Sequence, residues 1–235
     1  MSLTVVLCNY NYAHFIEASL KSIIDQSYTP LELLILDDAS TDNSVEIIKE
    51  AIKDVPYAKL IVNSKNLGYN KNFEKALSLV KGDYVVFTSP DDRMLPGYLE
   101  KSMNTLHKYP DAKLCISNHA HHDLSKGVYA PVTTTEPFSM LSKKMEEPIY
   151  LAPPDLVKLM RSTKFWVSGV TMVVNTEILR SSGGYREELA DKSDWFLLHT
   201  IGFRHGLCYI PETLVSMGVH SDSYSAAQTK EQKEE

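Results

Sequence analysis

The stretch LELLILDD (residues 31–38) decides the fold. Its four consecutive apolar residues end in two adjacent carboxylates, Asp37 and Asp38. A continuous apolar run, rather than an alternation of apolar and polar residues, is typical of a strand buried on both faces of a parallel sheet. LTVVLCNYN (residues 3–11) and YVVFTSPDD (residues 84–92) have the same form, a short apolar run that ends in polar residues. All three stretches are therefore predicted to be strands of one sheet.

Segments with helical spacing of apolar residues separate these strands. We predict helices over residues 13–26, 42–53 and 69–80, and a further short strand over residues 60–62. Strands that alternate with helices in this way form βαβ units, whose parallel sheet is covered by helices on both faces. Ligands of such sheets bind beyond the carboxyl ends of the strands. The polar residues that end the strands are thus expected to gather at the binding edge.

The second half of the chain is less regular. Residues 118–154 are rich in Pro, Thr, Ser and Lys and lack periodicity, which is typical of a functional loop. Around this segment we expect helices over 96–107, 155–164 and 194–203, and strands over 114–117, over 171–174, near Cys208 and near Val215.

Composition excludes several classes of protein. The 235 residues carry 43% hydrophobic and 23% charged residues, as expected of a globular chain, and the net charge is −6. An acidic chain without a basic cluster argues against a nucleic-acid binder. No apolar run approaches the roughly 18 residues of a membrane span, the start lacks secretory-signal features, and three widely spaced cysteines do not suggest disulfides or zinc. A cytoplasmic location is expected.

Asp37 and Asp38 are candidates for nucleotide binding. Two adjacent carboxylates repel each other unless a donor, such as a nucleotide base or ribose, uses them. The alternative is a strand exit followed by a helix cap. We favour this alternative for Asp42 and nucleotide binding for Asp38.

Asp91 and Asp92 are candidates for metal binding. Carboxylates are hard oxygen ligands suited to Mg²⁺ or Mn²⁺, which can hold a substrate diphosphate. A simple turn built on Pro90 and Asp91 is the alternative. The second pair of carboxylates, at the end of another strand, favours the metal site.

Two further positions are ambiguous from the residues alone. Asp194 is either a functional carboxylate or the cap of the helix it begins, and His220 is either functional or a surface residue. The histidines at 119, 121 and 122 match no metal-ligand spacing and are expected at the surface. The chain lacks a Gly-x-Gly-x-x-Gly fingerprint after its first strand, a Walker phosphate loop and a Gly-x-Ser-x-Gly elbow, which argues against dinucleotide, P-loop and serine-esterase chemistry.

Taken together, these motifs resemble family 2 glycosyltransferases of the GT-A fold. The matching segments occur in the family's order and span residues 3 to 225. They are VVLCNYN (5–11), SLKSI (19–23), QSY (26–28), ELLILDDASTD (32–42), NLG (66–68), KNF (71–73), GDY (82–84), GGY (183–185), SDW (193–195) and HSDSYS (220–225).

The resemblance implies an inverting transferase that moves a sugar from a nucleotide-diphosphate donor (UDP-, dTDP- or GDP-sugar) to a saccharide or lipid-linked acceptor. Asp194 matches the catalytic base. The metal, Mn²⁺ or Mg²⁺, is assigned to Asp91, Asp92 and His220. The nucleotide is assigned to a set formed by Cys8, Asn9, Tyr10, Asp38 and Lys71.

The implied fold is α/β: a Rossmann-like, mostly parallel sheet flanked by helices, with a smaller acceptor-side region. We expect one catalytic domain over residues 1–225, with a nucleotide-sugar half at 1–95, an acceptor half at 96–225 that contains the variable region 118–165, and a charged tail at 226–235. The resemblance is compatible with a homodimer and with association at the inner face of the membrane.

The chain departs from the family pattern at three positions. Ser89 stands where the metal motif has its first carboxylate, Ser193 replaces the usual Glu before the base, and Asn9 replaces a small residue. Two alternatives stay open: a sugar nucleotidyltransferase, although its glycine-rich, basic entry loop is missing after Leu7, and an inactive GT-A domain that only binds a partner.

Overall fold

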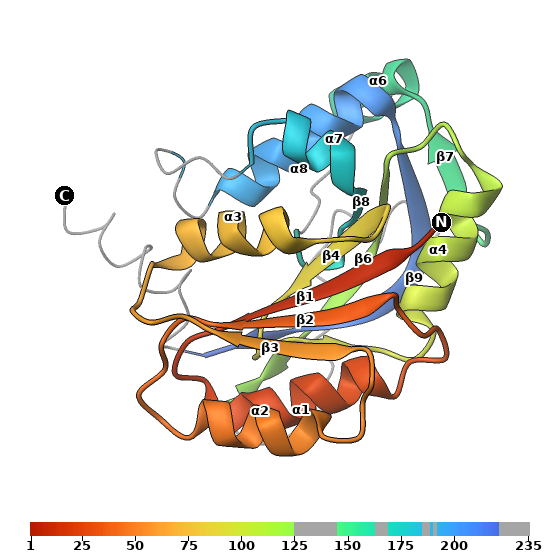
Figure 1. Cartoon of the computed structure of the whole chain (residues 1–235). Coiled ribbons are helices and arrows are strands. Elements are labelled where there is room, and N and C mark those ends of the chain that lie inside the picture. Colours follow the sequence, from red (N-terminus) through yellow and green to blue (C-terminus); the bar gives the residue numbers. More distant parts are fainter. Residues whose placement is uncertain (125–144, 163–168, 185–188, 190–191, 221–235) are drawn as a thin grey trace.

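The computed structural model describes residues 1–124, 145–162, 169–184, 189 and 192–220 (Figure 1). Some of the predicted features lie outside the described residues. They are part of the variable region, residues 163–164 of one helix, the segment 221–225 and the tail 226–235.

The N-terminal half has the predicted alternation of strands and helices. In order it contains β1 (Leu3–Asn9), α1 (Ala13–Ile24), β2 (Glu32–Asp37), α2 (Ser44–Ile52), β3 (Ala58–Val62), α3 (Tyr69–Leu79) and β4 (Tyr84–Thr88). The four strands are parallel and lie in the order β3-β2-β1-β4. This topology confirms the parallel sheet and brings the ends of β1, β2 and β4 to one edge.

The second half extends the sheet with mixed strand directions. It contains β5 (Arg93–Met94), α4 (Tyr98–Lys108), β6 (Leu114–Asp123), β7 (Ile149–Leu151), α6 (Pro153–Ser162), a 3₁₀ turn η2 (Gly169–Thr171), β8 (Val173–Asn175), α7 (Thr176–Ser181), α8 (Ser193–His205) and β9 (Leu207–Val219). Strand β8 joins β4 and β6 in antiparallel fashion, and β6 pairs with β9 in parallel.

Strands β6 and β9 differ from the sequence prediction. Strand β6 runs six residues further, to Asp123, and β9 is one strand of 13 residues where two short strands were expected. Their register shifts on either side of Asn118, where Ser117 pairs with Ile210 and Asn118 with Thr213. The extra residues of β9 include Pro211, which has no N–H to donate and is tolerated at such an irregularity.

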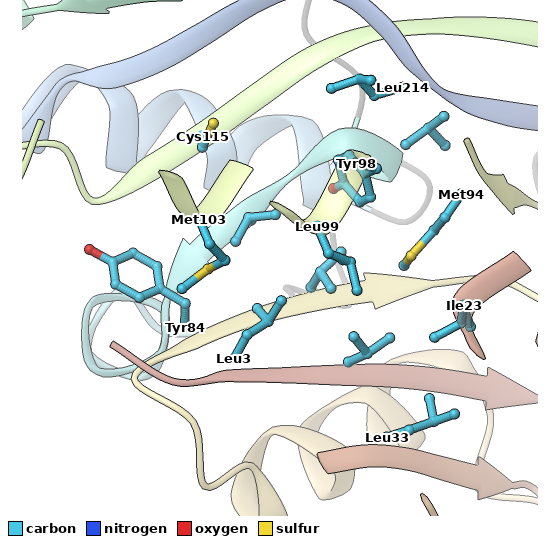
Figure 2. Close-up of a cluster of buried hydrophobic side chains, with 14 of the residues drawn as sticks. Leu3, Ile23, Leu33, Tyr84, Met94, Tyr98, Leu99, Met103, Cys115 and Leu214 are labelled. Atoms are coloured by element: carbon cyan, nitrogen blue, oxygen red, sulfur yellow. The ribbon is translucent and has the colours of Figure 1, made fainter. Parts of the chain in front are cut away.

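Helices cover both faces of the sheet. One face packs on α1, α2 and α4, and the other on α3, α6, α7 and α8 (Figure 1). Figure 2 shows the first of these layers, in which Leu3, Leu33 and Tyr84 of the sheet meet Ile23 of α1 and Leu99 of α4. Alternate residues of one strand serve the two layers, which explains why the strands read as continuous apolar runs.

Candidate active site

The turn after β4 and the end of β9 form a compact acidic cluster. His220 Nε2 lies 3.1 Å from Asp91 Oδ2, and both side chains are about one-tenth exposed. The next carboxylate, Asp92, accepts a hydrogen bond from the backbone N–H of Gly218 at 3.2 Å. The structure thus brings His220 to Asp91, 129 positions earlier in the chain, and His220 is not a surface residue.

The two carboxylates of the cluster are buried side by side. Asp91 Oδ1 is buried and has no hydrogen-bond partner. Burial, and then the negative charge of Asp91, raise the pKa of Asp92 well above its usual range. A buried acceptor without a donor and two repelling carboxylates are both features that a cation would relieve.

Two residues that sequence reasoning did not single out shape this cluster. A Cβ added to Gly218 would lie 2.5 Å from the carbonyl oxygen of Asp91, so only glycine allows this close approach. Arg93 is buried, and its guanidinium donates to the carbonyls of Pro90 and Asp92. It also donates to the carbonyl of Phe15 in α1, which ties the turn to that helix. Neither contact has a local signal in the sequence.

Two aromatic rings hold His220 in place. Its ring centroid lies 5.7 Å from that of Tyr12 and 5.3 Å from that of Phe15. The start of α1 therefore supports a residue at the other end of the chain. The sequence prediction did not include either ring.

Asp38 is buried at the end of β2 and binds the loop before α3. Its carboxylate accepts hydrogen bonds from the backbone N–H groups of Leu67 and Gly68, both at 2.9 Å, and from the Asn63 amide at 2.7 Å. Asn63 also donates to Asn72 of α3. These hydrogen bonds hold the loop that leads into α3 against Asp38. The sequence analysis did not predict them.

Asp37 points to a different set of partners. It accepts hydrogen bonds from the Asn9 amide at 2.7 Å and from the backbone N–H and hydroxyl of Ser40, at 2.8 and 2.7 Å. The two neighbouring carboxylates thus avoid repulsion because each has its own donors. Asp42 accepts hydrogen bonds from the backbone N–H groups of Ser44 and Ala13, at the starts of α2 and α1. Its side chain is therefore structural, although the N-cap residue of α2 is Asn43 and not Asp42 as predicted.

The other candidate nucleotide-binding residues lie along the same edge. Cys8 is half-buried near Asp38, and burial, with a smaller effect of Asp38, raises the pKa of its thiol to about 12. Tyr10 follows β1 and is 42% exposed, while Lys71 is exposed in the first turn of α3. Asn9 is buried against Asp37 and Ser40.

Asp194 lies in the first turn of α8 but does not cap it. Its Oδ1 accepts a hydrogen bond from the Trp195 N–H at 2.6 Å, and the helix begins at Ser193 without a side-chain cap. Its carboxylate packs on Gly169 of η2, where an added Cβ would lie 2.2 Å from Oδ2. Figure 1 shows the first turns of α3 and α8 on the side of the molecule where β9 ends. Asp191, a nearby carboxylate that could compete with Asp194 for the role of base, lies outside the described residues.

Gly169→Ala is expected to keep the fold and to lower by roughly tenfold or more any turnover that depends on Asp194, because the added Cβ would displace the Asp194 carboxylate. Steady-state rates measure the loss. The control is the same change in an Asp194→Asn background, where Gly169→Ala should cost nothing further. Equal losses in both backgrounds would show that Gly169 does not act through Asp194.

The prediction that the histidines at 119, 121 and 122 lie at the surface is wrong. His119 and His122 are buried in β6, and His121 is half-buried. Burial, with a smaller effect of His121, lowers the pKa of His119 to about 4. His122 lies 2.9 Å from the Ser216 hydroxyl of β9. The error arose because the strand was predicted to end at Ser117, whereas β6 continues through these residues to Asp123.

The described residues contain no group of three or more His, Cys, Asp or Glu side chains that could hold a metal ion. No helix within the described ranges has the length and apolar character needed to cross a membrane.

Comparisons with known proteins identify relatives of the chain. It is similar to the glycosyltransferase GlyA of Streptococcus pneumoniae, with 29% identity over 127 residues that cover 54% of this chain and 18% of that protein. The first curated relatives are longer proteins, of which the chain spans 32%, 31% and 18%.

Solved structures confirm the GT-A fold. S. aureus TarS (residues 1–349) in complex with UDP-GlcNAc matches with a TM-score of 0.74 at 16% identity, over 97% of this chain and 61% of that chain. The mannosyltransferase PcManGT from Pyrobaculum calidifontis, in complex with GDP-Man and Mn²⁺, matches with a TM-score of 0.68 at 19% identity, over 97% and 60%. The family model for glycosyl transferase family 2 matches residues 4–165. The chain therefore belongs to glycosyl transferase family 2.

Proposed function

We propose that this chain transfers a sugar, with inversion, from a nucleotide-diphosphate donor to a hydroxyl of a saccharide or lipid-linked saccharide acceptor. The observation that carries the proposal is the cluster in which His220 contacts Asp91 at 3.1 Å while Asp91 Oδ1 is buried without a partner. Membership of the family and its relatives named as glycosyltransferases support the same reaction class.

The cluster fits a divalent cation, Mn²⁺ or Mg²⁺. Asp91 and His220 would hold it, with Asp92 beside them. Such ions commonly use one or two carboxylates and take their remaining ligands from substrate phosphates and water, which agrees with a protein set smaller than a complete cage. A bound cation stabilises the negative charge of a departing diphosphate. A structural neighbour in complex with GDP-Man and Mn²⁺ supports this assignment.

The nucleotide would lie along the carboxyl edge of β1 and β2. Tyr10 exposes its ring there, and the Asp38 carboxylate lies beside the loop that opens α3. Lys71, in the first turn of α3, adds a positive charge next to a helix N-terminus, where anions are favoured. Neighbours in complex with UDP-GlcNAc and GDP-Man support a nucleotide-sugar donor.

Asp194 would act as the general base. An acceptor hydroxyl is a weak nucleophile at neutral pH, and it becomes reactive when a carboxylate takes its proton during attack. The oxygen then forms a bond to the anomeric carbon while the bond to the diphosphate breaks, and that electron pair leaves with the diphosphate. The start of α8 favours an ionised Asp194, and contacts with Gly169 and the Trp195 N–H fix its orientation.

Calorimetric titration with UDP-, dTDP- and GDP-sugars, with and without Mn²⁺, tests the proposal. We expect one nucleotide class to bind and Mn²⁺ to strengthen its binding. Absence of binding by every donor would favour a domain that only binds a partner. Release of pyrophosphate from a nucleoside triphosphate and a sugar phosphate would indicate a nucleotidyltransferase instead.

His220→Ala is expected to weaken Mn²⁺-dependent donor binding by roughly tenfold or more while the fold is kept, because a ligand and partner of Asp91 is lost. Calorimetry measures the effect. His14→Ala is the matched control, since His14 is exposed in α1 beside Phe15. Donor affinity unchanged by His220→Ala would remove His220 from the site.

A further inference from the structure

Helix α8 exposes aromatic rings where a helix at a protein surface usually presents polar residues. Trp195, Phe196 and Phe203 are each 40% exposed, whereas Leu197, Leu198 and Ile201 of the same helix are buried in the core. Large aromatic side chains at a surface commonly mark a contact with a ligand or partner. The position of each ring relative to Asp194 indicates which of them meets a substrate.

Trp195 directly follows the proposed base. Its backbone N–H donates a hydrogen bond to Asp194 Oδ1 at 2.6 Å. The ring and the carboxylate belong to consecutive residues in the first turn of α8. Phe203 lies eight residues further on, about 12 Å along the helix axis at 1.5 Å per residue. Along the helix, the Trp195 ring therefore starts much nearer to Asp194 than the Phe203 ring does.

The Trp195 ring packs against a second ring of the same helix. It lies against the His199 ring, with 4.2 Å between the ring centroids and 42° between their planes. His199 is 6% exposed and its Nδ1 lies 2.7 Å from the Trp195 carbonyl oxygen, which can only accept, so Nδ1 carries the proton. Burial lowers the pKa of His199, which keeps the imidazole neutral. Trp195 is thus an exposed ring held by a fixed neighbour.

The chemistry of this surface matches a sugar ring. A pyranose has an apolar face of C–H groups that packs on an aromatic ring, and an edge of hydroxyls that hydrogen-bond to polar groups. A rigid aromatic ring beside a carboxylate offers both kinds of contact. We propose that Trp195 is the platform on which the acceptor's terminal saccharide unit stacks, with its reacting hydroxyl directed at Asp194.

This inference rests on the proposed function, because it uses Asp194 as the group that meets the acceptor. The occupant it commits to is a saccharide. A second copy of the chain or a lipid surface would use the exposed aromatic residues of α8 together, and would therefore depend on Phe203 as much as on Trp195.

Two measurements test the platform, with Trp195→Ala, Trp195→Phe and Phe203→Ala as the variants. The first is saturation-transfer NMR with methyl glycosides of glucose, galactose, mannose and N-acetylglucosamine and with the disaccharides cellobiose, chitobiose and lactose. The second is steady-state kinetics with the acceptor that the transfer assay identifies. The NMR measurement needs no donor, so a failure of donor turnover and a failure of saccharide binding are read separately.

We expect Trp195→Ala to raise the saccharide Kd and the acceptor KM by about tenfold or more. Trp195→Phe should restore most of the affinity, and Phe203→Ala should leave it unchanged. Donor affinity should be the same in all variants, which separates the loss of stacking from a general loss of the fold. Wild-type-like binding by Trp195→Ala, equal losses in Phe203→Ala, or no binding of any saccharide to the wild type would overturn the proposal.

Discussion

Asp194→Asn is expected to lower the turnover of sugar transfer by about 100-fold or more while donor affinity and fold are kept. Asparagine has nearly the same shape and still accepts the hydrogen bond from the Trp195 N–H, but it cannot take a proton from the acceptor. Single-turnover rates with saturating donor measure the loss.

Two comparisons make this result specific to the base. Asp191→Asn serves as the matched variant because it changes a carboxylate three residues earlier in the chain. Calorimetric donor binding should be equal in wild type and both variants. A near-normal rate in Asp194→Asn, or a larger loss in Asp191→Asn, would assign the base to another residue.

Asp91→Asn is expected to abolish the enhancement of donor binding by Mn²⁺ and to lower turnover by roughly 100-fold or more. The amide keeps the size of the side chain but removes the charge that attracts a cation. Removal of one charge also relieves the repulsion that helps to raise the pKa of the buried Asp92, so the folded protein should lose little stability. Calorimetry with and without Mn²⁺ measures binding, and thermal unfolding checks the fold.

Asp92→Asn is expected to weaken donor binding less than Asp91→Asn does. Asp92 already accepts a hydrogen bond from the Gly218 N–H, whereas Asp91 Oδ1 has no partner, so the loss of donor binding should be smaller. Mn²⁺ that still strengthens donor binding in Asp91→Asn would contradict the assignment of the metal to Asp91.

The sequence was sufficient for the parts of the fold that depend on local patterns. Strands such as β2 are buried on both faces and therefore read as apolar runs, and the helices between them have apolar residues at helical spacing. It was insufficient for β6 and β9. Their pairing across almost a hundred residues, with the shifted register at Asn118, extends both strands through polar residues that have little strand character of their own.

The same distinction applies to the candidate site. Asp91, Asp92 and Asp38 could be proposed because they end buried strands, and the proximity of His220 to Asp91 agrees with the family resemblance. The supporting contacts could not be predicted, since they arise only when distant segments meet. Gly169 and Gly218 are two examples. The absence of a side chain matters at Gly169 because the Asp194 carboxylate lies beside it, and at Gly218 because the carbonyl oxygen of Asp91 does.

The most direct test of the account is release of nucleoside diphosphate from a panel of UDP-, dTDP- and GDP-sugars in the presence of Mn²⁺. We expect one donor to release its diphosphate, release to stop when the metal is chelated, and Asp91→Asn and Asp194→Asn to be nearly inactive. Turnover of a donor that is unchanged in both variants, or no turnover of any donor by the wild type in the presence of saccharide acceptors, would contradict the account.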